Sequence, residues 1–219
     1  MDIMHEIIMG NTVVAVGHHH GFEIGPDTML FESEKSILNQ LSPRKKSEWL
    51  ASRELLFRVA KLPNRAECLY DDFGKPHLKG IDKDISISHS ERWCSVIVSD
   101  ISCGVDIQVY RDTVQRISNR FLSDIELTEI EKKNNKLHYL HVYWGAKECI
   151  YKAYGKRKLE FRSHIFITSI DPTQCTAVGE IRYEDIHLTY DIHYRILPEA
   201  AWVFCMQHPV PISSHQSRL

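Results

Sequence analysis

Residues 85–109 have the sequence ISISHSERWCSVIVSDISCGVDIQV, and this stretch decides the fold class. Residues 85–88 alternate between apolar and polar side chains, and apolar runs follow at 93–98 and 103–109. Patterns of this period and length are typical of strands. We therefore predict three consecutive strands, with residues 100–102 forming a hairpin turn between the second and the third.

Helical patterns lie on both sides of these strands. Ser42-Pro43 is a typical helix start, and residues 43–61 place apolar side chains near the helical period. A second helix is predicted to begin at Ser123, and a third to run from about 137 to 154 and to end at Gly155. Further strands are predicted at residues 12–16, 165–170, 180–183, 187–196 and 202–206. Strands and helices grouped in blocks predict an α+β fold instead of a regular βαβ alternation.

The composition is that of an ordinary soluble globular protein, with 219 residues, 43% hydrophobic and 26% charged. This length allows one large domain or two small ones. A formal net charge of -2 argues against a wholesale nucleic-acid or membrane binder. No segment approaches the roughly 20 apolar residues of a membrane span, and no signal peptide is recognisable, so we expect a cytoplasmic protein. The six cysteines lack CxxC spacing, which favours reduced, packed thiols, and residues 18–20, three histidines, are expected in an exposed loop.

The predicted strand at 103–109 carries the first candidate functional residue, Asp106. Side chains alternate along a strand, so Gly104, Asp106 and Gln108 share one face and the apolar residues share the other. A glycine beside a carboxylate leaves room for a ligand or for another backbone. The alternative is an edge strand whose polar face meets water.

Further candidates lie on the predicted helices and at a strand end. Glu148 and Lys152 stand four residues apart and so share one helix face, although a plain surface ion pair has the same spacing. Ser88 and His89 offer donors suited to anionic oxygens, but Ser and His at a strand end also form turns. Glu126 is a candidate acid with a competing role, because residues 123–126 match a helix capping box.

Together these residues supply carboxylates for a hard cation, a lysine beside one of them, and donors for phosphates, to which Lys75 and Arg53 add positive charge. Such groups serve metal-assisted phosphoryl transfer. Spacing alone does not separate this chemistry from a nucleotide-binding regulator.

Four motifs follow one another in a specific order: FGKP at 73–76, ISHS at 87–90, GVDI at 104–107 and WGAKECIYK at 144–152. This order resembles the 4'-phosphopantetheinyl transferases, in the larger monomeric branch that activates carrier proteins of fatty-acid, polyketide and nonribosomal peptide synthesis. The resemblance covers about residues 40 to 165. It implies two similar α+β halves around a pseudo-twofold axis, residues 1–104 and 105–219, with coenzyme A and Mg²⁺ bound in the cleft between them.

By matching positions, the resemblance implies that Asp106 and Glu148 ligate Mg²⁺. Many relatives have Glu two residues after the motif aspartate, where this chain has Gln108. An amide oxygen can still coordinate Mg²⁺ or hold one of its waters, but the site then has one negative charge fewer, which predicts weaker metal binding. Glu148 is the expected base for the acceptor hydroxyl, and Glu126 or a metal-bound water is the alternative, because a carboxylate bound to a cation is a weak base.

The resemblance also implies contacts with coenzyme A. Three residues are expected at its phosphates: Lys75, Ser88 and His89. Arg53 would meet the 3'-phosphate end of the nucleotide, with Lys45 or Lys46 assisting. Lys152 corresponds to the lysine thought to steady or protonate the departing 3',5'-ADP. The expected reaction is attack of a carrier-protein serine on the β-phosphate of coenzyme A.

The expected partner is an apo acyl or peptidyl carrier protein, generally an acidic helical bundle, served by a monomer that binds neither nucleic acid nor membrane. Candidate docking surfaces are the helix after Ser123, residues 132–133 and residues 156–158. Two alternatives remain: a metal-dependent phosphohydrolase of a nucleotide diphosphate, and a non-catalytic nucleotide or nucleic-acid binding module that uses residues 152–158.

Overall fold

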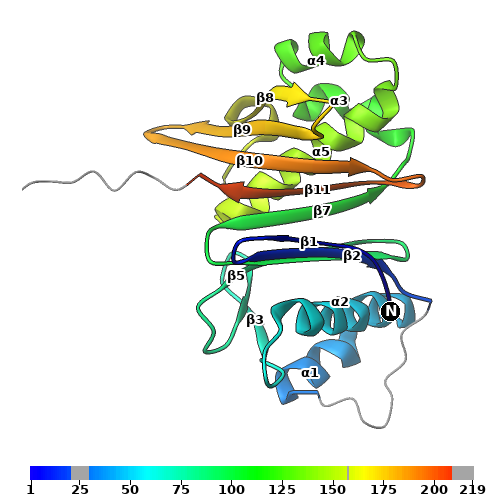
Figure 1. The fold of residues 1–219 in the computed structure, drawn as a ribbon, viewed down its shortest axis with the longest axis vertical. Coiled ribbons are helices and arrows are strands. Elements are labelled where there is room, and N and C mark those ends of the chain that lie inside the picture. Colours follow the sequence, from blue (N-terminus) through cyan, green and yellow to red (C-terminus); the bar gives the residue numbers. More distant parts are fainter. Residues whose placement is uncertain (21–29, 157, 209–219) are drawn as a thin grey trace, which may run out of the picture.

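Figure 1 shows the computed structural model of the chain, which describes residues 1–20, 30–156 and 158–208. Two antiparallel sheets and their covering helices make an α+β fold in two halves, as predicted. The first sheet has the strand order β1-β2-β6-β5-β4-β3. Its strands are β1 (Asp2–Met9), β2 (Thr12–His18), β3 (Cys68–Tyr70), β4 (Pro76–Leu78), β5 (Asp84–Ser90) and β6 (Trp93–Ser99).

The second sheet has the strand order β7-β11-β10-β9-β8. Its strands are β7 (Cys103–Val109), β8 (Ile165–Asp171), β9 (Thr176–Tyr183), β10 (Ile186–Ile196) and β11 (Ala200–Gln207). The helices are α1 (Glu32–Gln40), α2 (Pro43–Ala60), α3 (Thr113–Phe121), α4 (Asp124–Glu131), α5 (Lys136–Tyr154) and the short α6 (Phe161–His164). The predicted domain boundary after residue 104 falls inside β7.

The two sheets lie face to face, and helices cover their outer sides (Figure 1). One apolar cluster, including Val14, Ile107 and Trp202, fills the space between the sheets. A second cluster joins α2 to the first sheet, and a third joins α5 to the second sheet. Every residue of β6 is buried, because α2 covers one face of this strand and the second sheet covers the other.

The predicted helices at 43–61, after Ser123 and at 137–154 are confirmed as α2, α4 and α5. Pro43 occupies the first helical position of α2, where its missing N–H costs nothing. Ser123 and Glu126 form the predicted capping box of α4. Gly155 ends α5 in the left-handed conformation, at φ 66°, which a residue without a side chain adopts freely.

The predicted hairpin at residues 100–102 is wrong. β6 pairs with β2 and with β5, so both of its edges are occupied before β7 begins. β7 pairs instead with β11, the last strand of the chain. Residues 100–102 therefore carry the chain from the first sheet to the second.

Several elements had not been predicted, namely α1, α3, α6, β1, β3 and β4. The expected exposed loop of histidines is also wrong in part, since His18 ends β2 and His19 is buried. All six cysteines are free thiols, and all but Cys175 are buried, as expected.

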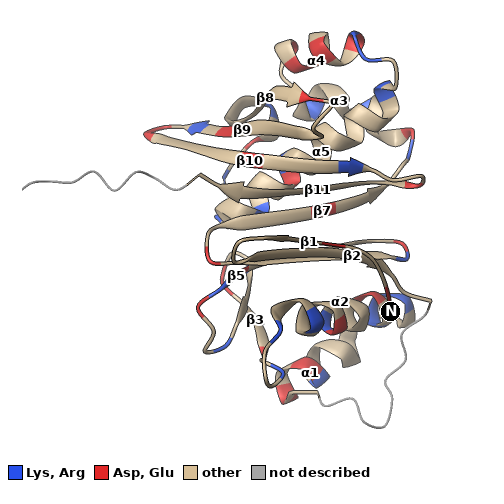
Figure 2. Ribbon diagram, in the orientation of Figure 1, with Lys and Arg blue, Asp and Glu red and all other residues tan. Residues whose placement is uncertain are grey.

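Charged residues are unevenly distributed over the helices (Figure 2). Lys and Arg are concentrated on α2, whereas α4 carries four acidic residues and no basic one. Among the described helices, none has an apolar stretch long enough to cross a membrane.

Candidate active site

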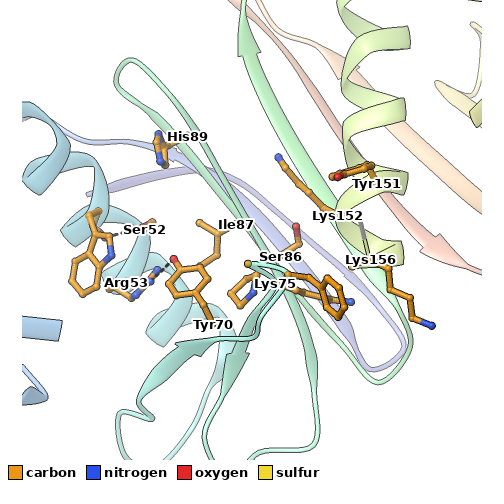
Figure 3. A pocket seen from close by; sticks show the side chains of 15 residues that line it. Ser52, Arg53, Tyr70, Lys75, Ser86, Ile87, His89, Tyr151, Lys152 and Lys156 are labelled. Atoms are coloured by element: carbon orange, nitrogen blue, oxygen red, sulfur yellow. Dashed lines mark hydrogen bonds between the residues drawn. The ribbon is translucent and has the colours of Figure 1, made fainter. Parts of the chain in front are cut away.

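A pocket of about 240 Å³ lies where the two halves meet (Figure 3). The first half contributes side chains from α2, from the loop between β3 and β4, and from β5, while the second contributes the end of α5 and the residues after it. Its lining includes Trp49, Arg53, Tyr70, Lys75, Ser86, His89, Tyr151, Lys152 and Lys156. Neither half forms this pocket alone.

Arg53 comes from α2 and is only 4% exposed. Its guanidinium lies over the Trp49 ring, 4.4 Å from the ring centroid, and its Nη2 donates to the Tyr70 hydroxyl at 2.7 Å. The Nε–H group has no hydrogen-bond partner among the described residues. Because a buried charged donor without a partner is costly, this guanidinium is suited to bind an anionic oxygen.

His89 lies on β5 at the edge of the same pocket, and its side chain is about half exposed. Its Nδ1 is 3.6 Å from Oε2 of Glu48. Burial lowers the pKa of His89, and the Glu48 carboxylate opposes this without cancelling it. A neutral imidazole can still donate one hydrogen bond to a phosphate. Lys45 and Lys46 are not among the residues that line this pocket.

Lys75 is engaged within the protein. Its ammonium donates to Oδ2 of Asp84 at 2.7 Å and to the carbonyl of Ala153, on α5, at 2.9 Å. Its aliphatic chain packs over Gly155, where an added Cβ would come within 2.6 Å of the Lys75 Cδ. The side chain therefore ties the first half to the end of α5 while it forms part of the pocket wall.

The face of β7 that carries Asp106 is covered by α5. A Cβ built on Gly104 would lie 2.7 Å from the carbonyl carbon of Cys149, so the glycine admits another backbone, one of the two predicted alternatives. This close contact leaves Asp106 only 2% exposed. β7 is an edge strand of its sheet, as the other alternative expected, but Asp106 on its polar face does not meet water.

The Asp106 carboxylate is held on one side and unpartnered on the other. Its Oδ1 accepts hydrogen bonds from the Ser88 hydroxyl at 2.8 Å and from the Lys152 ammonium at 2.7 Å. Its Oδ2 is buried and has no partner among the described residues. Ser88 is not among the residues that line the pocket, so the structure does not place it with His89 there.

Glu148 and Lys152 lie one turn apart on α5, as predicted, but Lys152 pairs with Asp106 and not with Glu148. Burial raises the pKa of Glu148, the Lys152 ammonium opposes this rise, and the Asp106 carboxylate adds to it. For Lys152, burial alone lowers the pKa, but the Asp106 carboxylate and other nearby groups outweigh it and the pKa is raised. Lys152 therefore stays protonated.

A second cavity, of about 320 Å³, lies on the other side of Lys152. Asp106, Gln108, Glu148 and Lys152 all line it, together with residues around α3. Lys152 lines both cavities, so the cavity that contains the two acidic side chains adjoins the pocket between the halves at this residue.

The residues present fit a Mg²⁺ ion. Asp106, Glu148 and Gln108 line one cavity, the Oδ2 of Asp106 has no partner among the described residues, and the Asp106 carboxylate disfavours ionisation of Glu148. No three His, Cys, Asp or Glu side chains are grouped for metal binding within the described part of the chain. Mg²⁺ characteristically uses one or two carboxylates and takes its other ligands from waters and substrate phosphates.

The structure does not bring Glu126 to this site, which corrects its candidacy as a base. Its carboxylate caps α4 by accepting from the backbone N–H of Ser123 at 2.7 Å, and it also accepts from the N–H of Ile167 at 2.8 Å. It pairs with the fully buried Lys147 at 2.8 Å. Lys147 also donates to two backbone carbonyls, so this pair satisfies its own hydrogen bonds and has a structural role.

The three expected docking surfaces differ in charge and in their position relative to the pocket. α4 is acidic, so like charge would repel an acidic carrier protein from it. Lys132 is paired with Glu129. Lys156 lies on the rim of the pocket, whereas Arg157 lies outside the described residues.

Sequence reasoning missed the aromatic residues of the pocket. Trp49 stands four residues before Arg53 on a predicted helix, a spacing that could have indicated their contact. Tyr70 and Tyr151 gave no comparable signal, because their approach to the pocket depends on how the two halves pack.

Comparison with known proteins finds similarity in the second half of the chain. Residues 102–206 match the sequence model of the 4'-phosphopantetheinyl transferase superfamily. A 4'-phosphopantetheinyl transferase of Bacillus subtilis is 31% identical over 88 residues, which are 39% of this chain and 39% of that protein's length. The matched family region contains Asp106, Glu148 and Lys152, but it does not reach Arg53 or His89. The similarity found by comparison is thus confined to residues 102–206, just under half of the chain, where the sequence is similar to the 4'-phosphopantetheinyl transferase superfamily.

Proposed function

We propose that this protein transfers the 4'-phosphopantetheine arm of coenzyme A to a serine of an apo acyl or peptidyl carrier protein, in a Mg²⁺-dependent reaction that releases 3',5'-ADP. The observation that supports this most directly is the position of Lys152. Its ammonium contacts Asp106, and it lines both the pocket that contains Arg53 and the cavity that contains Glu148. The pocket suited to anions and the cavity with the two acids therefore adjoin at the Lys152 ammonium.

The pocket between the halves is suited to the nucleotide part of coenzyme A. The buried Arg53, with its free Nε–H, supplies a charged donor for the 3'-phosphate, and His89 supplies a second donor nearby. Lys75 contributes positive charge to the pocket wall, although two of its three N–H groups are used within the protein. We assign no such role to Ser88, because its hydroxyl donates its proton to Asp106.

Asp106, Glu148 and Gln108 would hold the Mg²⁺ ion, which when bound supplies positive charge against the diphosphate. With Gln108 in place of a third acid, the site carries fewer negative charges, so modest metal affinity is expected.

In the transfer step, the serine oxygen forms a bond to the β-phosphorus of coenzyme A, and the bond from that phosphorus to the bridging oxygen breaks. Glu148, directly or through a water, takes the serine proton, because Glu126, the alternative side chain, is engaged elsewhere. Lys152, held at Asp106, donates to the departing oxygen of 3',5'-ADP.

The second cavity is the proposed approach for the acceptor serine. Arg111, which is paired with Glu91, lines it, and the adjacent α3 carries Arg116 and Arg120, whose charge would suit an acidic carrier protein. This surface replaces α4 in the expected docking arrangement. A monomer of the larger branch acting in the cytoplasm is part of the same proposal.

The test is a mass-shift assay with apo carrier proteins, coenzyme A and Mg²⁺, with and without a chelator. A gain of one phosphopantetheine that requires both cofactor and metal supports the proposal. Consumption of coenzyme A without carrier protein would indicate a phosphohydrolase. Steeply salt-dependent binding to nucleic acid without either reaction would indicate a binding module.

Variants separate the parts of the site. Asp106→Ala and Glu148→Gln should abolish transfer while the chain remains folded. Arg53→Ala should raise the KM for coenzyme A about tenfold, the loss of one hydrogen bond to a charged group, without changing Mg²⁺ dependence. Full activity in Asp106→Ala or Glu148→Gln would contradict the proposed metal site.

A further inference from the structure

Three serines of β5 form a regular ladder against β7, the edge strand of the second sheet. The hydroxyl oxygens of Ser86, Ser88 and Ser90 each accept a hydrogen bond from a backbone N–H of β7 at 3.2 Å. The donors are Val105, Ile107 and Val109. The hydroxyls thus act in place of the carbonyls of a neighbouring strand and join the two halves beside Asp106.

Ser88 differs from the other two serines because its hydroxyl donates a hydrogen bond to a carboxylate. It donates to Oδ1 of Asp106 at 2.8 Å, in a contact that is buried, while its oxygen accepts from Ile107. A hydroxyl has one proton, so both functions of Ser88 are used within the protein. Ser90 makes the same ladder bond without a carboxylate partner, and Ser86 lines the pocket.

The bond from Ser88 orients the Asp106 carboxylate. Two donors, Ser88 and Lys152, converge on Oδ1, and Oδ2 is buried near Gly145 with no partner in the part of the chain that the structure describes. If the carboxylate rotated about its Cβ–Cγ bond, either donor would lose its acceptor. The atom offered to a cation is therefore determined before any cation arrives.

We propose that Ser88 is a positioning residue that fixes the Asp106 carboxylate with Oδ2 free, which rests on the proposed function of Asp106 as a Mg²⁺ ligand. Groups that orient a metal ligand through a hydrogen bond typically change metal affinity 10- to 100-fold when removed. We expect the loss of Mg²⁺ affinity to lie at the lower end of this range, because Lys152 still donates to the same Asp106 oxygen when Ser88 is removed.

The experiment compares Ser88→Ala with Ser90→Ala, which loses the same ladder bond but no contact with Asp106. Mg²⁺ affinity, measured by calorimetry without coenzyme A, should fall about tenfold in Ser88→Ala and change less than twofold in Ser90→Ala. Ser88→Thr retains the hydroxyl and should recover most of the affinity. Equal affinities in Ser88→Ala and Ser90→Ala would overturn the proposal.

A second measurement does not depend on the metal or on transfer activity. In a double-mutant cycle, the combined effect of Ser88→Ala and Asp106→Ala on the unfolding equilibrium constant should differ about fivefold from the product of their separate effects. The effects of Ser90→Ala and Asp106→Ala on the free energy of unfolding should be additive. Additive effects for Ser88 would overturn the positioning role even if the enzyme transfers phosphopantetheine. Coupling without any transfer activity would instead refute the proposed function and leave the contact established.

Discussion

Replacing Gly104 by alanine tests the closest approach between β7 and α5. The new Cβ would lie 2.7 Å from the carbonyl carbon of Cys149 and 3.0 Å from its Cα, and nearer still to the carbonyl oxygen. Carbon atoms pack best at about 3.5–4.0 Å, so the strand and the helix must separate by about 1 Å. Since the obstructing atoms are backbone, no rotamer change relieves the contact. We expect a loss at the upper end of the overpacking range, about 3 kcal/mol.

The assay is urea unfolding of Gly104→Ala beside Gly145→Ala. The Cβ added at Gly145 lies in the same interface, but its nearest neighbour is a methyl group of Val203 at 2.8 Å. The side chain of Val203 can be shortened, so Val203→Ala should restore most of the stability lost in Gly145→Ala, whereas Cys149→Ala should restore none in Gly104→Ala. For a protein of this size, 3 kcal/mol corresponds to a fall in Tm of about 6–12 °C. A Gly104→Ala protein with an unchanged Tm would refute the inferred packing of α5 on β7.

Three further outcomes are expected. Tyr190→Phe should leave stability unchanged or raise it by up to about 1 kcal/mol in thermal unfolding, because the Tyr190 hydroxyl is buried without a described partner; a loss above 1 kcal/mol would reveal a partner. Lys147→Met should cost about 3–5 kcal/mol, since it leaves the Glu126 carboxylate buried without its cation, and a cost near zero would contradict the structural role of this pair. Burial raises the pKa of Glu148 in the folded protein, so its ionisation lowers stability as the pH rises from 4.5 through the raised pKa. In a chelator, Glu148→Gln should therefore have a higher Tm than the wild type at pH 7 and an equal one near pH 4; a pH-independent difference would exclude this cause.

Short-range sequence signals were reliable where neighbouring residues decide the structure. Ser42-Pro43 and Gly155 mark the ends of α2 and α5 because the preference of each for its position is local. The four-residue spacing of Glu148 and Lys152 placed them on one face of α5 because helix geometry is fixed by the backbone. The alternation in β7 likewise separated Asp106 from the apolar face that packs between the sheets.

Long-range pairing decided what the same patterns could not. Two adjacent strand patterns predicted a hairpin, but β6 already had a partner on each edge, and β7 joined the last strand of the chain. The Glu148 carboxylate lies one turn from Lys152 on the same helix, yet Lys152 pairs with Asp106 of β7, because α5 packs directly over that strand.

Periodicity and capping act over a few residues, so the sequence predicted the α+β class, three of the helices, most of the strands and the set of acids, cations and hydroxyls available for phosphoryl chemistry. Which of these residues take part in the proposed chemistry, and which stabilise the fold, depended on the tertiary structure. The Glu126 carboxylate pairs with the buried Lys147, and the Ser88 hydroxyl donates its proton to Asp106, whereas the Nε–H of Arg53 has no hydrogen-bond partner among the described residues. The first two contacts depend on how the sheets and helices pack, because their partners are 21 and 18 residues apart in the chain.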